Sequence, residues 1–211
     1  MLFRSGLSVL REIQKAMPQY STVYLGDNAR SPYGSRNAET IFKFTLEGVN
    51  ELFRRDAELI ILACNTSSSV ALRRIQQDFL PTAYPSRRVL GIVIPTAEEV
   101  STASRTKHIG ILATEATVAS RAYVDEIRKV DPQIQVSQQA CPLLVPMIEA
   151  GKTGELQTIC QNYVRRLLEQ DARMDTILLG CTHYALVEEQ IRQTVPPAVR
   201  VLSQEIGRAH V

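Results

Sequence analysis

Short apolar runs alternate with longer segments of helical periodicity along most of the chain. The runs hold four to six residues and most are continuous, which is typical of strands covered on both faces of a sheet. They predict strands at 22–25, 59–63, 89–93, 108–113, 134–137, 176–179 and 199–202. Between the runs, apolar residues recur at steps of three to five positions, as in amphipathic helices. These helical patterns cover 41–53, 70–79, 118–130 and 156–168.

The alternation of strands and helices predicts an α/β fold, with mainly parallel sheets flanked by helices. Ligands in such folds bind beyond the carboxyl ends of the strands. One pattern occurs twice: residues 59–66 and 176–183 each read as an apolar strand, a small residue, a cysteine and two polar residues, followed by a helical pattern. This weak repeat predicts two similar lobes with the active site in the cleft between them, and it places Cys64 and Cys181 opposite each other.

The expected lobe boundary lies near Pro95 and Thr96. Pro95 follows a predicted strand, and Thr96 is a residue type that caps helices. The organisation we expect is a first α/β lobe over residues 1–95, a second over 96–195, and a strand within 196–211 that returns to the first lobe. No low-complexity linker separates the halves, so close packing of the lobes is expected.

Composition narrows the class of protein. The 211 residues are 45% hydrophobic and 22% charged, values close to those of globular domains, and the net charge of +2 gives no sign of a nucleic-acid partner. No apolar run approaches the roughly 20 residues of a membrane helix, and no secretory signal opens the chain. The four cysteines are too sparse for a disulfide framework and form no CxxC pair for zinc. These features predict a cytoplasmic protein with reduced thiols, no metal and no membrane partner.

Both ends differ from the interior. Residues 205–211 have no hydrophobic period and, like residues 2–5, match the translation of a sequencing-adapter string. We therefore expect the native segment to run from about Gly6 to about Gln204, with a non-native tail after it and the gene continuing on both sides.

Cys64 and Cys181 are the candidates for chemistry. A cysteine between a strand and a helix lies near free N–H groups and the positive end of the helix dipole, which lower a thiol pKa. Thr66 or Ser67 can cap the first helix, and Thr182 the second. The alternative is that each cysteine is a small buried hydrophobe.

Two facing thiols can invert a carbon centre without a cofactor. One thiolate removes a proton from the carbon while the opposite thiol donates a proton to its other face. A disulfide oxidoreductase would instead need thiols close in sequence, and a hydrolase would need one cysteine with a base and an oxyanion hole.

Several motifs together resemble the cofactor-independent glutamate racemases over essentially all of residues 6–204. The motifs are Pro-Tyr-Gly at 32–34, Ala-Cys-Asn-Thr at 63–66, Gly-Cys-Thr-His-Tyr at 180–184, and Gly110, Thr114 and Thr117 between the two cysteine motifs. The resemblance implies two α/β lobes around a cleft, no cofactor, and two cysteine bases. Cys64 would act on D-glutamate and Cys181 on L-glutamate.

The same resemblance implies roles for other residues. Asn65, Thr66, Thr182 and the backbone around Tyr33 and Gly34 would hold the substrate, and His183 would assist Cys181. Thr114 and Thr117 would contact substrate or cap the following helix, and Glu149 would lie near the second thiol with a catalytic role or none. His183 favours glutamate as the substrate, because the related aspartate racemases usually resemble a Glu rather than a His at this position. The alternative is that His183 is a capping or surface residue.

Other positions depart from the family or lie outside its pattern. The family opens with a strand ending in Asp-Ser-Gly, whose Asp assists the first thiol, and this Asp is absent here; Ser5 and Gly6 sit too close to Leu7 to replace the motif. Cys160 falls within a helical period and Cys141 precedes a proline, so both are interpreted as structural.

The leading interpretation is a glutamate racemase that supplies D-glutamate for bacterial peptidoglycan, with glutamate as its small-molecule substrate and a homodimer as its expected assembly. Two alternatives remain: an aspartate or hydantoin racemase of the same superfamily, and a two-lobed amino-acid-binding protein that performs no chemistry.

Overall fold

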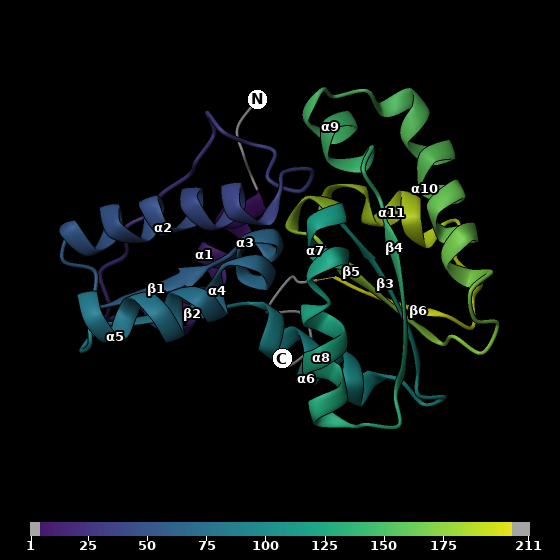
Figure 1. The fold of residues 1–211 in the computed structure, drawn as a ribbon. Coiled ribbons are helices and arrows are strands. Elements are labelled where there is room, and N and C mark those ends of the chain that lie inside the picture. Colours follow the sequence, from purple (N-terminus) through teal and green to yellow (C-terminus); the bar gives the residue numbers. More distant parts are fainter. Residues whose placement is uncertain (1–4, 204–211) are drawn as a thin grey trace.

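The computed structural model describes residues 5–203, so the predicted tail and most of the N-terminal adapter match lie outside the described residues. Two α/β bodies lie side by side, the first coloured purple to blue and the second teal to yellow (Figure 1). Within residues 5–203, no helix combines the length and the apolar character needed to cross a membrane.

The first lobe is built on a two-stranded parallel sheet. β1 (Leu59–Leu62) pairs with β2 (Arg88–Gly91) in the register Leu59 to Arg88. Its helices are α1 (Ser5–Ala16), α2 (Ala38–Arg54), α3 (Asn65–Val70), α4 (Leu72–Arg74), a π-helical turn (Ile75–Phe79) and α5 (Leu80–Ala83). The apolar stripe of α2 packs on the sheet, and its core includes Val49, Phe53, Ile60, Ile75 and Val89.

The second lobe has a four-stranded parallel sheet in the order β4-β3-β5-β6. Its strands are β3 (His108–Ala113), β4 (Gln135–Ala140), β5 (Thr176–Gly180) and β6 (Arg200–Leu202). Its helices are α6 (Val93–Ala103), α7 (Glu115–Ser120), α8 (Ala122–Val130), α9 (Leu144–Glu149), α10 (Thr153–Leu168), a 3₁₀ turn (Thr182–Val187) and α11 (Glu188–Arg192).

The two faces of this sheet pack against two separate hydrophobic cores. Ile109 and Ile111 of β3 pack with α6 and α8 on one face, while Leu112 packs with α9, α10 and α11 on the other (Figure 1). Gly110 permits the close approach of Met174 and Leu167, since a Cβ at this position would lie 2.3 Å from Met174 Sδ and 2.8 Å from Leu167 Cδ2. The apolar runs of β3 and β5 therefore form strands covered on both faces, as predicted, whereas Leu59 of β1 and Leu90 of β2 are 48% and 49% exposed.

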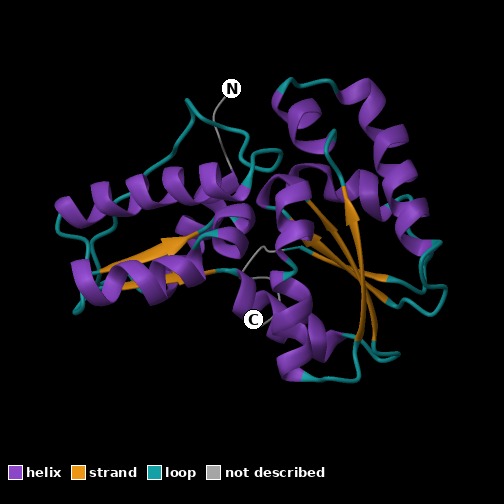
Figure 2. Ribbon diagram, in the orientation of Figure 1, coloured by secondary structure: helices purple, strands orange, loops and turns teal. Residues whose placement is uncertain are grey.

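Three features of the predicted organisation are wrong. Residues 22–25 form a loop rather than a strand (Figure 2), with Val23 60% exposed, because neither described strand of the first lobe lies beside them to pair. Pro95 and Thr96 lie inside α6, where Thr96 Oγ1 donates to the Ile92 carbonyl, and α6 packs in the second lobe. The strand near 200 pairs with β5, so it extends the second sheet instead of returning to the first.

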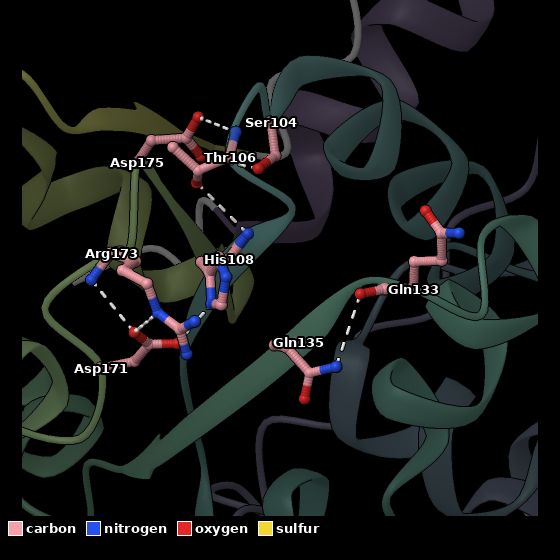
Figure 3. Close-up of polar contacts among 8 residues, drawn as sticks. All are labelled: Ser104, Thr106, His108, Gln133, Gln135, Asp171, Arg173 and Asp175. Carbon is pink, nitrogen blue, oxygen red and sulfur yellow. Dashed lines mark hydrogen bonds and ion pairs between the residues drawn. The ribbon is translucent and has the colours of Figure 1, made fainter.

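Polar contacts hold the amino ends of β3 and β5 together (Figure 3). Asp175 accepts hydrogen bonds from Ser104 Oγ at 2.6 Å and from the backbone N–H groups of Arg105 and Thr106 at 2.7 and 2.9 Å. His108 Nδ1 lies 2.5 Å from an Asp171 carboxylate oxygen. This edge of the sheet is opposite the carboxyl edge, so we interpret the cluster as structural.

Replacing Asp175 by asparagine is expected to destabilise the fold by about 1–2 kcal/mol at neutral pH, because charged hydrogen bonds are lost. Burial disfavours the Asp175 charge, yet hydrogen bonds from Ser104, Thr106 and Arg105 outweigh it and lower the pKa to about 2. A carboxylate whose pKa is lower in the folded state stabilises above its unfolded pKa of about 3.9, and this contribution is lost as the pH falls from about 4 to 2.

Urea unfolding across pH 2–7 measures this effect. The variant should lose stability near pH 7 and depend less on pH between 4 and 2, whereas the control D78N, at an exposed residue of the π-helical turn, should match the parent. Equal free energies of unfolding for D175N and D78N at pH 7 would contradict the assignment.

Candidate active site

The two cysteines occupy equivalent places in the two lobes. Cys64 follows β1 and is the N-cap residue of α3, and Cys181 follows β5 and is the N-cap residue of the 3₁₀ turn. The Cys64 carbonyl accepts the Ser68 N–H and the Cys181 carbonyl accepts the Tyr184 N–H, both at 2.9 Å. The predicted repeat is therefore present in the structure.

The predicted caps are wrong. Thr66 and Ser67 lie inside α3, and Thr182 is the first residue of the 3₁₀ turn. The helical conformation begins directly after each cysteine, so the cysteines themselves take the N-cap positions. Neither cysteine side chain makes a capping hydrogen bond.

The environments of the two thiols differ. Cys64 is exposed, whereas Cys181 is 7% exposed. Burial raises the pKa of the Cys181 thiol to about 12, with Cys64 and Glu149 adding to the effect and the N–H groups of His183 and Tyr184 opposing it. The lowered pKa expected of a thiol at the start of a helix is therefore wrong for Cys181, because desolvation outweighs the backbone donors.

A chain of polar groups leads away from the Cys181 sulfur. His183 Nδ1 lies 3.9 Å from Cys181 Sγ, and His183 Nε2 lies 3.2 Å from Oε1 of Glu149, the last residue of α9. Burial lowers the pKa of His183, and Glu149 acts in the opposite direction. A neutral His183 that donates from Nε2 to the carboxylate presents Nδ1 to the thiol as an acceptor.

The loop at 31–34 reaches the first thiol from the first lobe. The Tyr33 hydroxyl donates to Asp27, which is also paired with Arg30 Nε at 2.6 Å. Burial is the largest cause of the raised pKa of Tyr33, and the hydrogen bond to Asp27 is the second. Cys64 adds a further raising effect, so Tyr33 lies near Cys64.

Gly34 joins this loop to the second lobe. Its carbonyl accepts the Ala116 N–H at 3.0 Å, and a Cβ at this position would lie 2.6 Å from Cβ and Cγ2 of Thr114. Only glycine allows this approach without a shift of the loop or of Thr114.

Three buried threonines bridge the lobes beside Gly34. Thr66 Oγ1 lies 3.0 Å from Thr114 Oγ1 and 3.4 Å from Thr117 Oγ1, and the latter two lie 3.0 Å apart. Thr114 also caps α7 by accepting the Thr117 N–H at 3.3 Å. The capping interpretation of Thr114 is confirmed, and substrate contact by the three hydroxyls stays a prediction.

Cys141 and Cys160 lie in the positions expected of structural residues. The sheet register places Cys141, Thr114 and Cys181 directly after β4, β3 and β5, in one row at the carboxyl edge. Cys141 is buried and Cys160 packs inside α10, and burial raises the pKa of both thiols, to about 11 for Cys160.

Two cavities open beside the bridging residues. One of about 20 Å³ lies between residues 32–35 and 141–146, and a larger groove of about 670 Å³ lies between residues 34–38, α3 and α7. The walls of these cavities include Gly34 but neither Cys64 nor Cys181. A substrate space between the two thiols therefore stays a prediction.

Two hydrogen-bond partners of the site residues were not predicted from the sequence. The Tyr123 hydroxyl of α8 donates to Asn65 Oδ1 across the lobes, although its periodicity indicates only a core position. Ser31 Oγ donates to Glu149 Oε1 at 3.1 Å. Both contacts join residues far apart in sequence, and no local pattern signals them.

Comparison with known proteins identifies the family of the chain. The profile of the Asp/Glu/Hydantoin racemase family matches residues 3–204. A glutamate racemase of Geobacter metallireducens is 39% identical, and the match covers 98% of this chain and 74% of that protein. The crystal structure of a Bacillus anthracis glutamate racemase is 30% identical with a TM-score of 0.85, covering 95% of this chain and 73% of that one.

A second solved structure carries a ligand. The glutamate racemase of Francisella tularensis in complex with D-glutamate is 30% identical with a TM-score of 0.81, and the match covers 95% of this chain and 73% of that one. The profile match spans both cysteine motifs. The chain belongs to the Asp/Glu/Hydantoin racemase family.

Proposed function

We propose that this protein is a cofactor-independent glutamate racemase that interconverts L- and D-glutamate with Cys64 and Cys181 as its two bases. The observation that carries the proposal is the pair of cysteines at equivalent strand ends of two lobes, near enough for Cys64 to raise the pKa of Cys181. A binding protein has no need of two such thiols.

The residues around each thiol divide the reaction into two halves. With D-glutamate, Cys64 removes the α-proton and the Cys181 thiol, protonated in the resting state, donates a proton to the opposite face. With L-glutamate, Cys181 must first give up its proton, and His183 Nδ1 is the acceptor that lies beside it. We infer that Tyr33, Gly34, Asn65, Thr66 and Thr182 hold the charged groups of the substrate, with Thr114 and Thr117 as further contacts.

The substrate assignment is supported by the relatives, which are named glutamate racemases, and by His183 next to the second cysteine. Incubation of the full-length protein with L-glutamate, followed by circular dichroism, tests it. The signal should decay to zero as the racemate forms, with L-aspartate and a 5-substituted hydantoin changed far more slowly. Decay with one of these two and none with glutamate would replace the proposed substrate.

The wider role follows from the product. D-Glutamate is a component of bacterial peptidoglycan, so we infer a place in the supply of cell-wall precursors in the cytoplasm. A homodimer stays a prediction that analytical ultracentrifugation of the full-length protein checks.

Replacing Gly34 by alanine is expected to raise KM for glutamate about tenfold, a loss of about 1.4 kcal/mol of binding. The new Cβ would clash with Thr114 and move the loop that carries Tyr33 away from the threonine cluster. Steady-state kinetics measure this. The matched control is G154A in α10, where a Cβ has no neighbour within 4 Å; an unchanged KM for G34A would remove the 31–34 loop from the site.

A further inference from the structure

Ser31 connects the loop of the first lobe to the polar chain behind the second thiol. Its hydroxyl donates to Glu149 Oε1 at 3.1 Å, across 118 positions of sequence, and the same oxygen lies 3.2 Å from His183 Nε2. Glu149, which accepts this hydrogen bond, and its partner His183 are largely shielded from solvent, with side chains 27% and 17% exposed.

The two donors to Glu149 act together. A carboxylate that accepts two hydrogen bonds is held in one orientation, and the charged acceptor strengthens each bond. The orientation of Glu149 decides whether the His183 proton resides on Nε2, which leaves Nδ1 to take the proton of Cys181. The hydroxyl comes from the first lobe and the other three groups from the second, so the bond exists only when the lobes are in contact.

We propose that Ser31 is a positioning residue of the second thiol: by bonding Glu149 across the lobes, it aligns His183 for proton transfer with Cys181. This inference rests on the proposed racemase function. It predicts that loss of the Ser31 hydroxyl weakens the Cys181 half of the reaction and leaves the Cys64 half intact.

The two halves can be measured separately with the D and L enantiomers of threo-3-chloroglutamate. Removal of the α-proton by one cysteine leaves an electron pair that forms the Cα=Cβ bond as chloride departs, and the enamine then hydrolyses to 2-oxoglutarate and ammonia. The D form needs only Cys64 and the L form only Cys181. Chloride release from each enantiomer therefore reports one thiol at a time.

In the full-length protein, S31A should release chloride from the L form about fivefold more slowly, the rate equivalent of one lost hydrogen bond, with the D form unchanged. S31T keeps a hydroxyl and should restore most of the rate. In the E149Q background, S31A should have no further effect, because the two residues act in one chain. S101A is the matched control, since the Ser101 hydroxyl donates to the Ala97 carbonyl within α6.

The outcomes separate the two proposals. If the parent protein does not interconvert the glutamate enantiomers, the proposed function fails. If it does, the Ser31 inference is overturned by unchanged release from the L form, by equal loss with both enantiomers, by failure of S31T to restore the rate, or by an additive loss in the E149Q background.

Discussion

Replacing either Cys64 or Cys181 by serine is expected to lower the rate of racemisation by about 10³-fold or more. Inversion needs a proton acceptor on one face of the α-carbon and a donor on the other, and the serine hydroxyl is far less acidic than a thiol. The loss should be measured by circular dichroism with L- and D-glutamate, and it should be equally severe in both directions, because both thiols act in each turnover.

The two variants should nevertheless differ with the 3-chloroglutamates. C64S should retain chloride release from the L form and C181S from the D form, since each keeps one base. C160A is the matched control: its thiol is buried in α10, so it should keep the racemisation rate and lose about 1 kcal/mol of stability to a small cavity. Racemisation at the parental rate by either serine variant, or its loss in a folded C160A, would contradict the two-thiol mechanism.

Replacing His183 by asparagine is expected to slow chloride release from the L form about 100-fold, the lower range for a positioned acid–base group. Asparagine retains an N–H for Glu149 but cannot take the proton of Cys181. Release from the D form should fall far less, since Cys64 is the base in that half.

The pH dependence gives a second measurement on the same variant. The titratable groups that face His183 are Glu149 from α9 and Cys181 from the end of β5. Burial lowers the pKa of His183, so the imidazole is neutral near pH 7 and accepts a proton, and acidification removes this capacity. The parental rate with the L form should therefore fall on the acidic side, and H183N should lose this limb. Equal losses for both enantiomers, with the limb retained, would assign His183 a structural role only.

Strands and helices with strong local patterns were predictable. The runs that became β3 and β5 are continuous and apolar, and the core confirms that both their faces are covered. The apolar run at 22–25 has the same appearance, but a strand also requires a paired neighbour, which periodicity does not report. Likewise, the sequence of β6 indicates a strand and contains no information on which sheet it joins.

The candidate site was predictable where a motif carries the chemistry. The repeated cysteine motif identified both thiols and their N-terminal helix positions. The pKa of Cys181 was not predictable, because it depends on how completely the second lobe buries the sulfur. The contacts of Ser31 with Glu149 and of Tyr123 with Asn65 join different lobes, so they appear only once the chain is folded.

The most direct test of two opposed thiols is racemisation in D₂O, with the early products analysed by chiral separation and mass spectrometry. Starting from L-glutamate, the first D-glutamate formed should carry deuterium at the α-carbon while the remaining L-glutamate keeps its proton, and the reverse should hold from D-glutamate. Each cysteine then serves one face only. Deuterium entering the remaining substrate as fast as the product, or product that retains the original proton, would show a single base serving both faces and would contradict the assignment of Cys64 and Cys181.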